Sequence, residues 1–192
     1  MPVLVKQFVQ AFIPLFIAID PIGLAAVFLG LGQGVPAAQR QRIAWQATVT
    51  GGGVALAFLF LGQNIFRALG ISAGDFQIAG GLILFVLAGR DLVLPAVEGE
   101  KISDDFGIVP LGMPLIAGPA LITTLLVLAQ TIGWAQAFAG LVANLVLVVL
   151  AFAFSERIGR AIGATGMRAI SKIISMLLAA IAVSMVRRGI SG

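Results

Sequence analysis

A single carboxylate lies inside an apolar segment near the start of the chain. Asp20 is the only charged residue between Phe8 and Leu31, a run long enough to cross the hydrocarbon core of a membrane. A charge near the middle of a spanning helix costs at least about 2.5–3.5 kcal/mol, so such residues commonly serve substrates, ions or protons. Pro21 follows directly and Gly23 comes soon after, which predicts a helix break at the position of the charge. We therefore expect Asp20 to face a cavity and to bind a cation or a proton.

Asp20 has a second interpretation, in which it only begins a helix. Aspartate is among the best N-cap residues and proline is favoured at the first helical position, so Asp20 could simply cap a half-helix that starts at Pro21. No Lys or Arg occurs in the interior of any predicted span, and the sequence therefore offers Asp20 no ion-pair partner within the membrane. This favours the binding role, and a protonated, neutral Asp20 in the resting state stays open.

A second helix break is predicted about a hundred residues later, at Gly118-Pro119. Pro110 and Pro114 precede it and are spaced four residues apart, so the segment before the break should be bent or unwound. A half-helix beginning near Pro119 would carry the partial positive charge of its N-terminus with no carboxylate to neutralise it. Such an end binds anions, although the same break could also serve only to pack helices.

The predicted anion site consists of backbone and hydroxyl groups of the second half-helix. The N–H groups near Ala120 and Leu121 would bind a carboxylate, and Thr123 and Thr124 could add hydroxyls one turn further on. If the two breaks lie at one depth, Asp20 would bind an ammonium group beside them. The pair of breaks therefore predicts a site for a zwitterion.

Two further polar residues lie in predicted spans. Asn144 is flanked by apolar residues, and Thr48 occupies the matching part of an earlier span. Both could hydrogen-bond a ligand or a broken helix. The alternative is a hydrogen bond that only holds helices together, worth about 0.6–2 kcal/mol.

The composition places these residues in an integral membrane protein. Of the 192 residues, 60% are hydrophobic and 10% are charged, whereas a soluble domain is about 25% charged. We expect an all-α fold with one membrane domain whose six spans cover residues 8–31, 44–66, 75–95, 108–131, 136–155 and 172–187.

Several classes of function are disfavoured by what the sequence lacks. It contains neither cysteine nor histidine, and its cations are scattered over short connections, which argues against nucleic-acid binding. We find no metal-ligand cluster, no nucleotide-binding glycine loop and no catalytic triad. We therefore expect no cofactor, no metal and no enzyme activity.

The two halves of the chain look like a duplication. A shift of 98 residues brings Asp20-Pro21 onto Gly118-Pro119, and a shift of 96 brings Thr48 onto Asn144. The acidic stretch 98–106 separates repeat one, residues 1–97, from repeat two, residues 106–192. Because each repeat has three spans, the second must be inverted relative to the first, an architecture typical of transporters.

The distribution of Lys and Arg predicts the orientation. Eight of these residues fall in the connections after the first, third and fifth spans and four on the opposite side. The positive-inside rule places the richer side in the cytoplasm. Both termini should then lie on the outer, periplasmic side of a bacterial cytoplasmic membrane.

Three motifs resemble the MarC family of six-span membrane proteins. They are FIAIDPIG at 16–23, FQIAGGLILF at 76–85 and VPLGMPLIAGPALIT at 109–123, and the late stretch 170–190 also fits. The family commonly has a second glycine where Ala120 stands and an arginine where Lys172 stands. The family is grouped with LysE-type exporters. The resemblance implies transport of small neutral amino acids such as glycine or alanine, coupled to protons or another cation.

We therefore expect a secondary transporter that binds a small-molecule substrate and contacts membrane lipid. Export of another small solute is one alternative. A non-transporting accessory or scaffold subunit of a larger membrane complex is another, and the chain could also form homo-oligomers. Transport predicts that the two breaks enclose a polar cavity, whereas a scaffold predicts that side chains fill the space between them.

Overall fold

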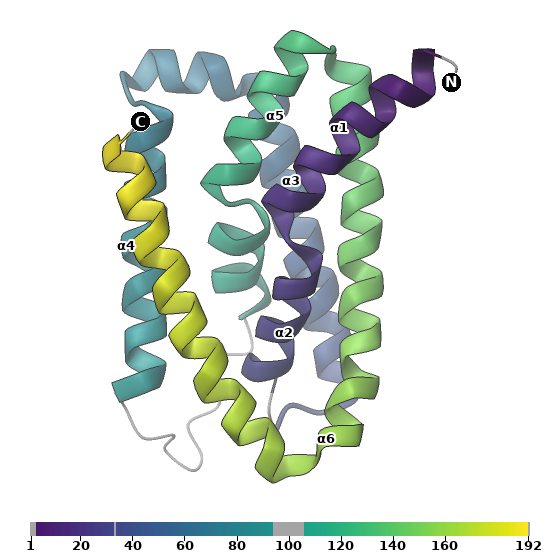
Figure 1. Ribbon diagram of the computed structural model, residues 1–192, viewed down its shortest axis with the longest axis vertical. Helices are drawn as coiled ribbons and strands as arrows, with labels where there is room; N and C mark the ends of the chain where they lie inside the picture. Colours follow the sequence, from purple (N-terminus) through teal and green to yellow (C-terminus); the bar gives the residue numbers. More distant parts are fainter. Residues whose placement is uncertain (1–2, 33, 94–105, 192) are drawn as a thin grey trace.

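The computed structural model describes residues 3–32, 34–93 and 106–191, and every regular element in these ranges is a helix (Figure 1). The acidic residues 98–105, which separate the two predicted repeats, lie outside the described residues. The elements, in chain order, are α1 (Val3–Ile19), α2 (Pro21–Leu31), α3 (Ala37–Leu69), α4 (Ala73–Val93), η1 (Gly107–Ile116), α5 (Pro119–Thr131) and α6 (Trp134–Ser191).

Several of these helices are long and apolar enough to cross a membrane. Three segments of the described chain qualify, namely Leu4–Leu31, Ala37–Leu69 and Trp134–Ser155, and the bent pair of η1 and α5 would be a fourth. α4 contains a shorter apolar helix, Gly74–Val86. The all-helical membrane class is thus confirmed, while the count of six spans stays a prediction.

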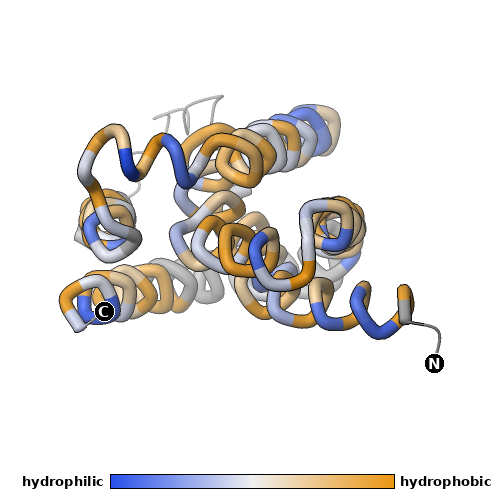
Figure 2. Tube along the Cα trace, turned by 90° about the horizontal axis from the view of Figure 1, so that it is seen from above, coloured by the Kyte–Doolittle hydropathy of each residue, from blue (hydrophilic) through white to orange (hydrophobic). Residues whose placement is uncertain are grey.

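The outward surfaces of the helices are apolar, as lipid contact requires. Figure 2 shows hydrophobic residues on the outer sides of the helices as well as on the sides that face other helices. Ile17, Ile22 and Val86 are about 70% exposed, at 72%, 73% and 69%. In water such exposure would promote association, whereas in lipid it costs nothing because the acyl chains are equally apolar.

Both breaks occur at the predicted residues. α1 ends at Ile19 and α2 begins at Pro21, so only Asp20 separates them. In the second half, η1 ends at Ile116 and α5 begins at Pro119, with a bend of 48° between the two segments. In each case a proline occupies the first position of the new helix, where its missing N–H leaves no gap in the hydrogen bonding.

The segment before the second break is irregular, for a local reason. Val109 and Met113 both have extended backbone angles within η1. Each precedes a proline, Pro110 or Pro114, and the proline ring disfavours helical angles at the preceding residue. The predicted bending of this segment is therefore confirmed.

The last two predicted spans belong to one helix. The basic stretch between the predicted spans 136–155 and 172–187 is expected to form a loop, but α6 keeps helical backbone from Trp134 to Ser191. That prediction is wrong. This stretch has no proline to interrupt a helix, and it includes several residues that favour helix formation. Figure 1 shows that α6 turns sharply at the lower end, so its two arms still run in opposite directions.

Both chain ends lie at the same end of the molecule. Figure 1 marks N and C at the top, while the turn of α6 and the connection from α2 to α3 lie at the bottom. This arrangement fits an even number of crossings.

Glycines allow α4 and the second arm of α6 to pack closely and antiparallel. A Cβ added to Gly189 would lie 2.5 Å from the carbonyl oxygen of Gly74 and 2.6 Å from Ile78 Cγ1. A Cβ at Gly81 would lie 2.8 Å from the carbonyl oxygen of Ala182. Backbone atoms cannot move aside as side-chain ends can, so any larger residue must separate the two helices.

Replacing Gly189 with alanine should therefore lower the thermal stability of the detergent-solubilised protein, by an overpacking penalty of about 1–3 kcal/mol. The matched control is Gly53→Ala on α3, because nothing lies within 4 Å of a Cβ built there. In a helix interior that change should be neutral or stabilising by up to about 1 kcal/mol. Equal melting temperatures for the two variants would contradict this account of the contact between α4 and α6.

Candidate functional site

The two helix breaks line one cavity. It has a volume of about 840 Å³ and is bounded by residues from α1, α2, α4, η1, α5 and α6. Asp20 and Gly23 from the first break and Gly118, Pro119 and Ala120 from the second all contribute to its wall. The predicted convergence of the two breaks is therefore observed, and the space between them is open.

Asp20 has the geometry of an N-cap. Its backbone is left-handed, with φ 50° and ψ 68°, a conformation that aspartate tolerates better than most residues. The side-chain Oδ1 accepts a hydrogen bond of 3.0 Å from the N–H of Gly23. The capping interpretation is thus confirmed.

The cap leaves part of the carboxylate free. Asp20 is exposed and lines the cavity. Its Oδ2 has no hydrogen-bond partner among the described residues. One carboxylate oxygen therefore holds the helix start, while the other, which lies over Gly23, is left without a protein partner among the described residues.

Gly23 is required by this arrangement. A Cβ at this position would collide with the carboxylate of Asp20, whose Oδ2 and Cγ lie directly over it. Any other residue at position 23 would therefore push the carboxylate away from the helix start. The short spacing from Asp20 to Gly23 is thus a steric requirement of the cap.

The N-terminus of α5 has no side-chain cap. Gly118 is extended, with φ −77° and ψ 165°, and has no side chain to accept a hydrogen bond. Pro119 has no N–H, and the first helical bond runs from the N–H of Ile122 to the carbonyl of Gly118, at 3.1 Å. The N–H groups of Ala120 and Leu121 therefore have no partner within the helix and carry its partial positive charge.

The threonines of α5 contribute less than the sequence suggests. The hydroxyl of Thr123 donates to the carbonyl of Pro119 at 2.9 Å, and that of Thr124 donates to the carbonyl of Ala120 at 2.7 Å. Each hydroxyl proton is therefore used within the helix. Of the two, Thr124 lines the cavity and Thr123 does not.

Three polar residues of the cavity were not singled out from the sequence. They are Gln77 on α4 and Ser184 and Arg188 on α6. Helical spacing could have indicated the last two, since the cavity residues Leu177, Ile181, Ser184 and Arg188 recur every three or four positions. In the sequence, Arg188 is one of the four basic residues that the charge distribution places on the outer side of the membrane.

The cavity thus combines groups of opposite polarity. Asp20 is the only carboxylate among its described lining residues, and Arg188 is the only cation. No ion pair joins these two residues. Most of the remaining wall is apolar, including Ile17, Leu24 and Leu177. Such a cavity suits a small molecule that carries both charges and little else that is polar.

A family comparison agrees with this architecture. The model of the MarC family of integral membrane proteins matches residues 5–192. The chain belongs to the MarC family.

Curated MarC relatives cover almost the whole chain. The UPF0056 membrane protein YvbG of Bacillus subtilis is 33% identical over 96% of this chain and 94% of its own length. A UPF0056 membrane protein of Methanocaldococcus jannaschii is 30% identical over 97% of each chain. YhcE of Escherichia coli, also a UPF0056 membrane protein, is 28% identical over 94% of this chain and 90% of its own. No solved structure matches the chain.

The remaining predicted site residues of this MarC protein lie outside the cavity wall. Asn144 is completely buried, and its Nδ2 donates to the carbonyls of Phe12 at 3.1 Å and Gly140 at 2.8 Å. It therefore ties α6 to α1, which is the helix-packing role. Thr48 is also buried, and its hydroxyl donates to the carbonyl of Ala44 at 2.9 Å.

Pro21 and Leu121 are also buried and do not line the cavity. Either residue would contribute to ligand binding only through the backbone at the start of its helix. Binding roles for Thr48 and Asn144 stay predictions.

Proposed function

We propose that this MarC protein is a secondary transporter of small neutral amino acids, such as glycine and alanine, across the bacterial cytoplasmic membrane. The observation that carries the proposal is the shared cavity of the two breaks, with the Asp20 carboxylate on one wall and the uncapped α5 N-terminus on another. A free amino acid carries an ammonium group and a carboxylate, and this cavity offers a complement to each.

The assignment of groups follows from charge. The free oxygen of Asp20 binds the ammonium group, while the N–H groups of Ala120 and Leu121 bind the carboxylate. Arg188, on α6, adds a second positive group that binds the substrate carboxylate. The apolar wall around Ile17 and Leu24 suits a short aliphatic side chain.

Alternating access requires two halves that can move against each other, and the packing supports an inverted repeat. α3, in the first half, packs on η1, where a Cβ at Gly112 would lie 2.9 Å from Thr50 Cβ. α6, in the second half, packs on α1, where a Cβ at Gly140 would lie 3.0 Å from Ala11 Cβ. Each half thus contacts the broken helix of the other, as two-fold related repeats would.

This arrangement completes the proposed topology. Six spans, counted with the two arms of α6 separate, leave both termini on the periplasmic side by the charge bias. The site then lies at the interface of the repeats, and protons or another cation could couple through Asp20.

The proposal is tested by counterflow in proteoliposomes. Purified protein reconstituted with internal unlabelled alanine should accumulate labelled alanine and glycine, and empty liposomes should not. Labelled aspartate and lysine serve as controls, because each places a second charge against the apolar wall. Absence of alanine and glycine flux in liposomes with verified protein insertion would contradict the proposal and favour the scaffold role.

A further inference from the structure

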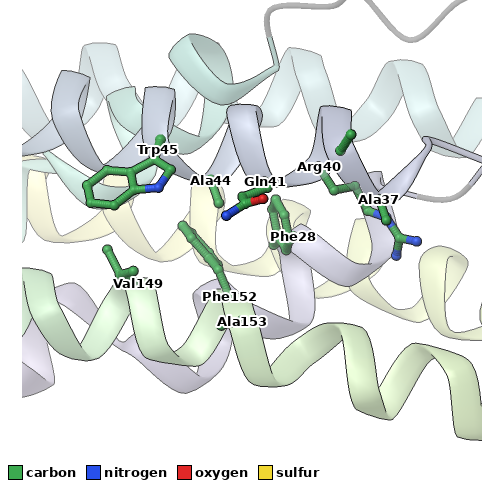
Figure 3. A pocket seen from close by; sticks show the side chains of 10 residues that line it. Phe28, Ala37, Arg40, Gln41, Ala44, Trp45, Val149, Phe152 and Ala153 are labelled. Atoms are coloured by element: carbon green, nitrogen blue, oxygen red, sulfur yellow. The ribbon is translucent and has the colours of Figure 1, made fainter.

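A second cavity lies near the connection from α2 to α3 (Figure 3). It has a volume of about 360 Å³ and shares no lining residue with the first cavity. Its wall combines the end of α2, the beginning of α3 and the first arm of α6. The floor contains Phe28 and Phe152, whose ring centroids are 4.6 Å apart.

One end of this cavity is basic and polar. Arg40 and Gln41, from the first turns of α3, contribute polar side chains, and no carboxylate is among its described lining residues. The guanidinium Nε of Arg40 is buried and has no hydrogen-bond partner in the described part of the chain. A buried donor without a partner is unfavourable, so the guanidinium of Arg40 has unused hydrogen-bonding capacity beside the cavity.

The position of Arg40 depends on close packing against the preceding connection. A Cβ at Gly32 would lie 3.2 Å from Arg40 Cδ, so the aliphatic part of the arginine lies against this glycine. This contact holds the side chain of Arg40 beside the beginning of α3.

The opposite end of the cavity is apolar and aromatic. Trp45 and Val149 line it, and Figure 3 shows them at the far end of the groove from Arg40. Trp45 is 55% exposed, so its ring also faces the surroundings of the protein. Along α3 the lining thus changes from charged to apolar within about two helical turns. Because an α-helix rises about 1.5 Å per residue, the two kinds of lining lie close together.

We propose that this groove binds one anionic phospholipid. The phosphate accepts hydrogen bonds from Arg40 and Gln41, and an acyl chain runs along Phe28, Trp45 and Val149. The change from basic to apolar along the groove matches the order of groups in a phospholipid, and arginine binds phosphate with two parallel hydrogen bonds. An uncompensated arginine favours a headgroup with net negative charge over a zwitterionic one.

Native mass spectrometry of the full chain in detergent tests this proposal, with added phosphatidylglycerol or phosphatidylcholine. The wild type should retain one phosphatidylglycerol and bind phosphatidylcholine more weakly. Arg40→Gln should weaken phosphatidylglycerol binding about fivefold, the effect of one basic residue near a membrane surface. The matched control is Arg42→Gln, because Arg42 has the same charge on the same helix but is exposed and does not line the groove.

A second variant keeps the charge and fills the space. Ala153 lines the groove from α6 and is exposed, so Ala153→Trp should block the acyl chain and lower retention while Arg40 stays intact. Inorganic phosphate and glycerol phosphate distinguish a lipid site from a site for a free anion. The proposal would be overturned if the Arg40 and Arg42 variants lost phosphatidylglycerol to the same extent, or if Ala153→Trp retained it fully. It would also be overturned if glycerol phosphate competed for the site as well as phosphatidylglycerol does.

Discussion

Replacing Asp20 with asparagine is expected to lower the transport of alanine about 10- to 100-fold, the effect of removing a charged hydrogen-bonding partner. The substitution tests the charge separately from the cap, because asparagine can accept the hydrogen bond from the N–H of Gly23 as aspartate does. It also tolerates the left-handed backbone at this position. The helix start should therefore survive while the ammonium group loses its counter-charge.

Counterflow of labelled alanine in proteoliposomes measures this effect. Propionate, which lacks the ammonium group, provides a second comparison, because the preference for alanine over propionate should shrink in the variant. Asp75→Asn is the control. Asp75 accepts hydrogen bonds from Ser72 at the start of α4 and does not line the cavity, so its transport should stay near wild type.

Transport of alanine at the wild-type rate by the Asp20→Asn protein, with its pH dependence unchanged, would remove Asp20 from the mechanism. The cavity would then need another binding group for the ammonium. Asp20 would keep only its capping role.

Replacing Arg188 with glutamine is expected to raise the KM for alanine about fivefold or more, as loss of one charge-assisted contact to a carboxylate should. Arg188 lies in the last turn of α6 and lines the same cavity as Asp20. A guanidinium there would bind the substrate carboxylate together with the N–H groups at the start of α5. Arg188→Lys should retain part of the affinity because the charge remains.

The neighbouring residue supplies a matched control for Arg188. Arg187 is exposed on the same turn and does not line the cavity, so Arg187→Gln should leave the KM unchanged. Alaninamide, which has no carboxylate, should compete weakly with alanine in the wild type and more evenly in Arg188→Gln. Equal effects of the two substitutions would indicate that only overall surface charge matters.

Together the two variants divide the proposed site by chemistry. The Asp20 variant should alter discrimination against substrates that lack an ammonium group. The Arg188 variant should alter discrimination against substrates that lack a carboxylate. Variants that disturb helix packing, such as Gly189→Ala, should instead lower thermal stability without changing either substrate preference.

The sequence by itself determined the local features of this protein. Asp20-Pro21 and Gly118-Pro119 mark both helix breaks, because proline chemistry and N-capping act within one or two turns. The apolar composition determined the membrane class, and the MarC motifs determined the family. The basic stretch between 155 and 172 predicts a loop, but it contains no proline, and α6 continues through it as a helix.

Only the tertiary structure decided which side chains meet. Helical periodicity gives the face on which Arg188 lies, but it does not say which other helix that face contacts. The same holds for Asn144, whose amide binds the carbonyl of Phe12 more than a hundred residues earlier instead of lining the cavity. Contacts across such distances depend on how all the helices pack together, so no local pattern contains them.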